Sequence, residues 1–136
     1  MNWLSSIANV VLQCLRLTTA PPPPPPQPPQ TPRMEKYAWM KLKREVWKEY
    51  YGDKEEGLCY CCGIVIMRDK CGHECSHVVA LARGGKNEKE NLRPCCRKCN
   101  RSMHVQNMYV WMVKMDKRGP GRNNADAYIK QHNLKV

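Results

Sequence analysis

The chain has 136 residues, a length that predicts one domain with a tail. Its formal net charge is +11, and Arg16 is the only charged residue before Arg33, so the basic charge lies in the folded part. This balance favours a polyanionic partner such as nucleic acid, although a basic ribosome-like or virion-packing protein would share it. The chain has no Phe, so a metal ion would help to stabilise so small a fold.

Residues 1–20 are predicted to form an apolar tail. Over residues 2–19, Leu4, Ile7 and Val11 recur at helical spacing, which predicts a short amphipathic helix. This segment lacks the basic start of a signal peptide and is too short and polar to span a bilayer. We therefore expect neither secretion nor membrane association, and interpret the tail as a loose or partner-docking segment.

Residues 21–33 are predicted to be a proline-rich linker, because they include a run of six prolines. Such a run adopts the extended polyproline II conformation and acts as a semi-rigid spacer. The alternative role is to bind a protein module of the SH3 or WW kind. In both cases the working domain is predicted to span residues 34–136.

Residues 34–51 have the spacing of an amphipathic helix that Gly52 can end. The apolar positions of this helix are predicted to be core residues: Trp39, Leu42, Val46, Trp47 and Tyr50.

The middle of the chain is predicted to form strands. A short strand is expected at residues 64–67, and a second at residues 74–81, which are apolar and β-branched. Gly84 with Gly85 supplies a turn, and residues 91–94 return the chain. These segments predict a hairpin with a long loop.

The last third is predicted to be helical. No helix breaker occurs between Pro94 and Gly119, which predicts one long helix. One face of it would carry Val105, Met108, Met112 and Met115. A short final helix is expected at residues 126–132, so the predicted fold class is α+β.

Nine cysteines include two CxxC pairs, whose spacing is typical of metal ligands rather than disulfides. Four thiolates satisfy a tetrahedral zinc ion without an open position, so the predicted zinc is structural, and the predicted compartment is reducing, either cytoplasm or nucleus. Cys71 with Cys75 is the alternative pair, and the roles of Cys61 and Cys95 stay open. The preferred ligands are Cys59, Cys62, Cys96 and Cys99.

Several short motifs occur in order after the first pair, and the last of them includes the second pair. They are Glu74-Cys75-Ser76-His77, Gly84-Gly85, Asn91-Leu92-Arg93-Pro94 and Cys96-x-x-Cys99-Asn100. This series resembles the HNH endonuclease family, and within it the HNH proteins of large DNA viruses, over residues of about 58–110. The resemblance implies a small zinc-stabilised ββα-metal (His-Me finger) fold with flanking helices, and possible action of a viral protein in a host cell.

The resemblance also implies roles for single residues. His77 matches the general base that takes a proton from water, and Asn91 matches the central Asn that ties down the loop and orients the base. Asn100 matches a ligand of a catalytic Mg²⁺ or Mn²⁺ ion. The chain departs from the family at Ser76, where a metal-binding Asp or His is usual, because a neutral hydroxyl is a poor ligand for a hard cation.

Other residues could complete the catalytic metal site. His104 lies four residues after Asn100, so a continuous helix would put both on one face, and Ser76 stays a tentative ligand. Glu74 is a further candidate, on the expectation that it shares a strand face with His77.

Basic residues of the hairpin loop and the CxxC segments are predicted to contact the phosphate backbone, without reading the base sequence. They are Arg83, Lys86, Lys89, Arg93, Arg97, Lys98 and Arg101. The sequence thus predicts a metal-dependent endonuclease acting on DNA, expected to be double-stranded. The alternatives are a catalytically inactive HNH fold that binds nucleic acid or builds a virion, and a zinc-ribbon interaction module, against which the charge argues.

Overall fold

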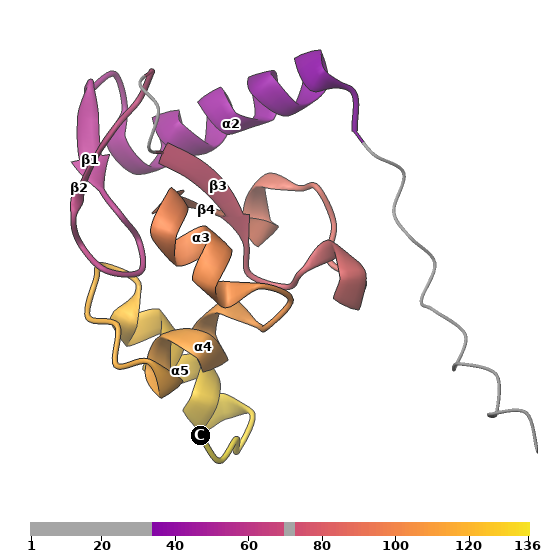
Figure 1. The fold of residues 1–136 in the computed structure, drawn as a ribbon, viewed down its shortest axis with the longest axis vertical. Helices are drawn as coiled ribbons and strands as arrows, with labels where there is room; N and C mark the ends of the chain where they lie inside the picture. The colour runs from indigo at the N-terminus through magenta and orange to yellow at the C-terminus, as the bar shows by residue number, and fades with distance from the viewer. Residues whose placement is uncertain (1–33, 70–72) are drawn as a thin grey trace, which may run out of the picture.

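The computed structural model describes residues 34–69 and 73–136, and the predicted tail and linker lie outside them. Its elements confirm a mixed α+β fold (Figure 1). The helices and strands are α2 (Lys36–Tyr51), β1 (Glu56–Leu58), β2 (Val65–Met67), β3 (His73–His77), β4 (Leu92–Cys96), α3 (Arg97–Met103), α4 (Met108–Lys114) and α5 (Arg122–Gln131). Two short 3-10 turns lie between β3 and β4: η1 (Leu81–Arg83) and η2 (Lys89–Asn91).

Helix α2 confirms the first predicted helix. It buries Val46 and Trp47 and packs against β3 and β4. It ends at Gly52, whose φ of 61° lies in the region that favours glycine and whose N–H donates to the Lys48 carbonyl at 2.9 Å. The helix thereby covers one face of the β3–β4 sheet (Figure 1).

Two antiparallel two-stranded sheets are present, β1–β2 and β3–β4. The predicted hairpin is confirmed, with His77 opposite Leu92, but its first strand ends at His77 rather than at residue 81. The strand ends there because Asn91 forms hydrogen bonds with the two residues that follow His77. The Asn91 carbonyl accepts from the Val78 N–H at 2.8 Å, and the Asn91 side chain binds the backbone of Val79. Strand β1 was not predicted from the sequence.

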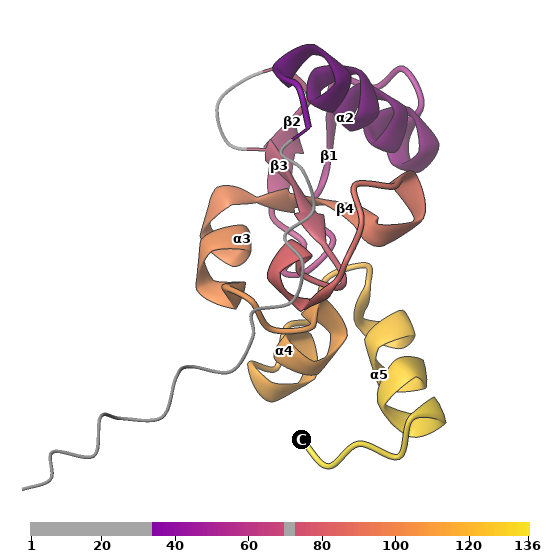
Figure 2. The ribbon, with the colours of Figure 1, turned by 90° about the vertical axis from the view of Figure 1, so that its right-hand side faces the viewer.

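The prediction of one long C-terminal helix is wrong, because the chain breaks into α3 and α4. His104 has a φ of 50°, and Asn107 accepts hydrogen bonds from Tyr109 N at 3.0 Å and Val110 N at 3.3 Å. A capping Asn starts a new helix without any Gly or Pro. The turn lets Met103 and Met108 both enter the core, and α5 packs beside α4 (Figure 2).

The core has two parts. The larger joins the cysteine segments to the C-terminal helices through Trp47, Tyr60, Trp111 and Met112. The smaller lies between α2 and the β3–β4 sheet and contains Val46, Cys75 and Leu92. Within residues 34–69 and 73–136, no helix combines the length and the apolar character needed to cross a membrane.

The cap of α4 gives a first prediction. Replacing Asn107 by Ala should lower the free energy of unfolding by about 1 kcal/mol, because two backbone N–H groups lose their acceptor. Asn107→Asp should retain most of the stability, and Asn123→Ala, at an exposed position of α5, should change it little. Thermal and urea unfolding measure the differences. Equal stability of Asn107→Ala and the unsubstituted protein would contradict the capping role.

Candidate functional site

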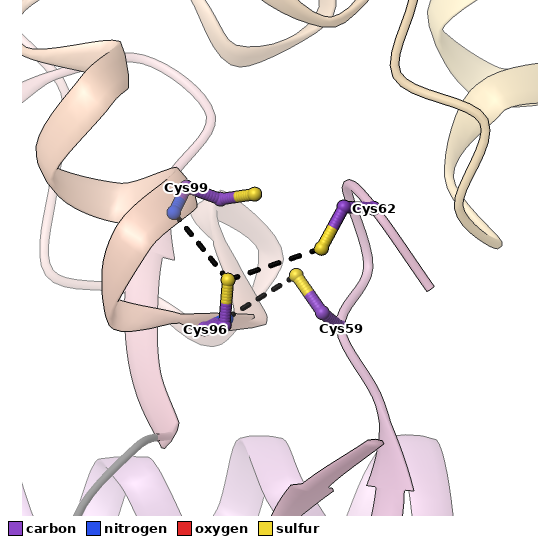
Figure 3. A group of neighbouring side chains, drawn as sticks. All are labelled: Cys59, Cys62, Cys96 and Cys99. Carbon is purple, nitrogen blue, oxygen red and sulfur yellow. Dashed lines mark hydrogen bonds between the residues drawn. The ribbon is translucent and has the colours of Figure 1, made fainter. Parts of the chain in front are cut away.

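Four cysteines from two distant segments converge (Figure 3). Cys59 and Cys62 follow β1, Cys96 ends β4, and Cys99 lies in α3. Their sulfur atoms all lie within 4.8 Å of one another, and the Sγ atoms of Cys62 and Cys96 are 3.9 Å apart. Tetrahedral zinc with 2.3 Å bonds to sulfur separates its ligands by about 3.8 Å. This group therefore fits a metal ion such as zinc.

Backbone hydrogen bonds hold the two segments in this arrangement. The Gly63 N–H donates to the Cys59 carbonyl at 2.8 Å, and Gly63 has a φ of 78°, so the first segment forms a tight turn. The Cys96 N–H donates to Cys59 Sγ at 3.2 Å, and the Cys99 N–H donates to Cys96 Sγ at 3.4 Å. Such bonds favour negatively charged sulfur and orient it, as a metal site requires.

The remaining described cysteines lie outside the group of four. Cys61 and Cys95 are fully buried, with Sγ atoms 3.4 Å apart. Cys75 packs with Val46 and Leu92, and burial raises the pKa of its thiol to about 11, so it stays protonated at neutral pH. Its proposed partner, Cys71, is outside the described residues.

The two faces of β3 carry different groups, because side chains alternate along a strand. His77 faces α2, where its ring stacks on Trp39 with centroids 5.9 Å apart and planes inclined by 10°. Ser76 faces α3, where its Oγ donates to Asn100 Oδ1 at 2.7 Å. The predicted base and the predicted metal ligands therefore lie on opposite faces at the end of one strand.

His77 is half-buried and well fixed. Its Nε2 lies 2.8 Å from Asn87 Oδ1. A pocket of about 360 Å³ opens beside the ring and is also lined by Met34, Lys36, Trp39, Leu81 and Asn87. Sequence reasoning missed Asn87 and Trp39 as site residues. Nothing distinguishes Asn87 from an ordinary loop Asn, and the helical spacing of Trp39 indicated only a core position.

His73 lies on the same face of β3 as His77, is half-buried, and packs against the core residue Trp47. Its Nδ1 is 3.0 Å from the Arg68 carbonyl oxygen, and its ring packs edge-on against Trp47. Burial, with a contribution from nearby Lys43, lowers its pKa. His73 is therefore a weaker base than a free histidine, and its Nε2 is buried without a hydrogen-bond partner.

The Asn91 side chain connects two parts of the long loop between β3 and β4. Its Oδ1 accepts from the Val79 N–H at 2.9 Å, and its Nδ2 donates to the carbonyls of Val79 and Lys86, each at 3.0 Å. Only a side chain with both donor and acceptor can make these bonds. The loop that Asn91 closes also carries Asn87, the partner of His77.

On the α3 side, Glu74 joins Ser76 and Asn100. Asn100 Nδ2 donates to Glu74 Oε2, and Arg97 Nε donates to Glu74 Oε1 at 3.0 Å. The expectation that Glu74 shares a face with His77 is wrong: the two are three residues apart, so the alternation of a strand puts them on opposite faces. The same alternation puts Glu74 beside Ser76.

The structure does not put His104 on one helical face with Asn100. Helix α3 ends at Met103, and His104 is the exposed residue at its end, with a φ of 50° and a ψ of −124°. The premise for pairing these two ligands, a continuous helix, is wrong.

The seven basic residues predicted to contact phosphate have different environments. Arg83, Lys98 and Arg101 are exposed and have no ion-pair partner among the described residues. Arg93 is half-buried, lies over the Tyr60 ring and donates to Tyr109, so it contributes to the core. The other three are paired with carboxylates: Lys86 with Glu88, Lys89 with Glu49, and Arg97 with Glu74.

Comparison with protein families gives one match: residues 59–106 match the HNH endonuclease model. The resemblance to this family is thus confirmed over a segment that runs from the first cysteine of the metal group past α3, and that includes His77, Asn91 and Asn100. Helices α2, α4 and α5 lie outside it. No curated protein and no solved structure matches the chain.

The cysteine geometry predicts one tightly bound metal ion per chain. Cys59→Ser and Cys96→Ser should each lose it and unfold at lower temperature, because a three-thiolate site binds more weakly and metal binding contributes to folding. Cys61→Ala, which removes a buried thiol outside the group, is the matched control and should retain the metal. Elemental analysis of the purified variants measures this. Full metal content in both serine variants would rule out the assignment.

Proposed function

We propose that this protein is a metal-dependent endonuclease that hydrolyses DNA phosphodiester bonds with His77 as the general base. The observation that supports it most is the setting of His77, a half-buried imidazole fixed by Asn87 and Trp39 beside a pocket, inside the segment that matches a nuclease family. Geometry of this kind is what general-base catalysis needs.

The hydrogen bond to Asn87 determines which nitrogen of His77 acts. A carbonyl oxygen only accepts, so Nε2 carries the ring proton and donates to Asn87 Oδ1. Nδ1 is then the unprotonated nitrogen, and it takes a proton from the water that attacks phosphorus. Trp39 limits rotation of the ring, and Asn91 holds the loop that carries Asn87.

Two metal sites are part of the proposal. The four cysteines hold a structural zinc ion, since their closed sulfur shell leaves no position for a reacting water. Asn100 contributes an oxygen ligand to Mg²⁺ or Mn²⁺. When bound, such an ion stabilises the charge on the phosphate and on the leaving oxygen.

DNA is the proposed substrate, in double-stranded form. The net charge of +11 provides attraction to phosphate, and the exposed Arg83, Lys98 and Arg101 have no competing carboxylate among the described residues. Such contacts place the backbone without selecting a base sequence. The thiolate ligands favour a reducing compartment, cytoplasm or nucleus, where a viral protein would act in its host cell.

One observation favours a second function, that of an inactive HNH fold that binds nucleic acid or serves in a virion. Ser76 is fully buried and hydrogen-bonded to Asn100, so the position before the base offers no charged ligand. The proline-rich segment would then serve to bind another protein.

Replacing His77 by Ala should lower the rate of plasmid cleavage in Mg²⁺ or Mn²⁺ by a factor on the order of 10² to 10⁴, because the attacking water loses its base. Affinity for DNA and zinc content should stay close to the original values, since the imidazole contributes little to ground-state binding. Nicking of supercoiled plasmid, with chelator as the blank, measures the rate.

His132→Ala is the matched control, because His132 is exposed at the end of α5, outside the family match. Equal loss of activity in both variants, or full activity in His77→Ala, would refute the proposed role. If the unsubstituted protein cleaves no duplex, single-stranded or branched DNA with any divalent ion, the inactive binding protein becomes the better account.

Affinity for duplex DNA should fall steeply with salt, because the contacts are cationic side chains that displace counterions from phosphate. The double variant Lys98→Ala with Arg101→Ala should lower the slope of log K against log salt by roughly 0.9 for each lost contact. Lys130→Ala, on α5, should leave the slope unchanged. Fluorescence anisotropy over a salt series measures it, and a slope near zero would exclude the proposed backbone contacts.

A further inference from the structure

Three oxygen-bearing side chains meet between β3 and α3. Ser76 Oγ donates to Asn100 Oδ1 at 2.7 Å, and Asn100 Nδ2 donates to Glu74 Oε2. Glu74 and Ser76 lie two residues apart on β3 and so share the face toward α3, which carries Asn100. Glu74 brings a negative charge to a place where Ser76 brings none.

Charge decides whether such a group can bind a hard cation. Mg²⁺ and Mn²⁺ are bound through one or two carboxylates, completed by water and by phosphate oxygens of the substrate. Asn100 and Ser76 are both neutral, and Ser76 is fully buried. Glu74 is the carboxylate that contacts Asn100, and its side chain keeps 26% of its surface exposed. An ion could therefore reach Glu74 from solvent.

We propose that Glu74 supplies the anionic ligand of the divalent ion, together with Asn100, and that Ser76 positions Asn100 instead of binding the ion. This inference rests on the proposed metal-dependent nuclease and names the ligand that compensates for the serine before the base. It replaces the assignment of Ser76 and His104 as ligands with a residue that already contacts Asn100.

The serine suits this arrangement because a hydroxyl both donates and accepts. In the structure Asn100 turns its amide nitrogen toward Glu74 and its oxygen toward Ser76. If the side-chain amide of Asn100 flips, its Oδ1 lies beside the Glu74 carboxylate. Both oxygens can then bind the same cation. Ser76 Oγ then accepts from Nδ2, so the buried hydroxyl keeps a hydrogen bond in both orientations.

Arg97 must move away from Glu74 before an ion can bind there. It donates to Glu74 Oε1 at 3.0 Å, and half of its side-chain surface is exposed. An exposed ion pair of this kind is weak, so a divalent ion can displace the guanidinium from Glu74. The released Arg97 stays at the start of α3, where its guanidinium is then free to bind a phosphate oxygen.

A purely structural role for Glu74, in which it only anchors α3 through Arg97, makes different predictions. In that case Glu74→Gln and Arg97→Gln would both destabilise the fold and neither would change ion binding. If Glu74 is a ligand, the two variants act in opposite directions, because one removes the ligand and the other removes its competitor.

The test is a titration of the full zinc-loaded chain with Mn²⁺. The electron paramagnetic resonance signal of free Mn²⁺ measures how much of the ion is bound. We expect one weak site, with affinity reduced about tenfold or more in Glu74→Gln and increased in Arg97→Gln. Ser76→Asp added to Glu74→Gln should restore affinity, since it returns a carboxylate to the same face. Glu90→Gln removes an equal charge from an exposed turn and should have no effect.

Zinc content and thermal unfolding verify that each variant is folded. Unchanged Mn²⁺ affinity in folded Glu74→Gln, or no Mn²⁺ binding by the unsubstituted protein, would overturn the inference. Should Glu74→Gln fail to fold, Arg97→Gln decides: tighter binding supports a ligand at Glu74, and unchanged binding overturns it. Binding that depends on Glu74 without any DNA cleavage would support this site while refuting the proposed nuclease.

Discussion

The rest of the structure depends on the joining of two short cysteine segments, residues 59–62 and 96–99, whose members Cys62 and Cys96 lie 34 positions apart in the chain. Each sheet has only two strands, and β1 and β2 have three residues each, so neither sheet is stable alone. Convergence of the four sulfurs connects the β1–β2 hairpin to β4 and α3. A bound metal would offset the entropy of closing this loop, which a core without Phe offsets only in part.

The same junction determines where the candidate catalytic groups lie. Asn100 directly follows Cys99, so the segment that could hold a metal ion also directs Asn100 toward β3. Strand β3 is held in register by β4, with Ser76 opposite Arg93 and Glu74 opposite Cys95. The α2 face of β3 depends on a different part of the chain, because Trp39 comes from a helix outside the family match. Family resemblance alone therefore describes only one side of the candidate site.

Sequence patterns predicted the features that depend on residues close together in the chain. The spacing of apolar residues gave α2 and its end at Gly52, and CxxC spacing gave the four cysteines that converge. The prediction of one long C-terminal helix was wrong because the periodicity of apolar residues indicates a buried face but not the place where the chain turns. The local signal for that turn was Asn107, a residue type that can cap the start of a helix. Trp39 and Asn87 could not be assigned to His77, because their contacts with it depend on how α2 and the long loop pack against β3.

In the proposed site, β3 separates two chemical tasks that would interfere on a single face. A divalent ion beside an imidazole disfavours the protonated ring, and so opposes the transfer of a proton from water. Placing His77 toward α2 and Glu74 with Asn100 toward α3 keeps the strand backbone between base and cation. His77 is the last residue of β3, and Asn100 contacts Ser76 directly before it, so the proposed base and the proposed cation ligand are neighbours across the strand.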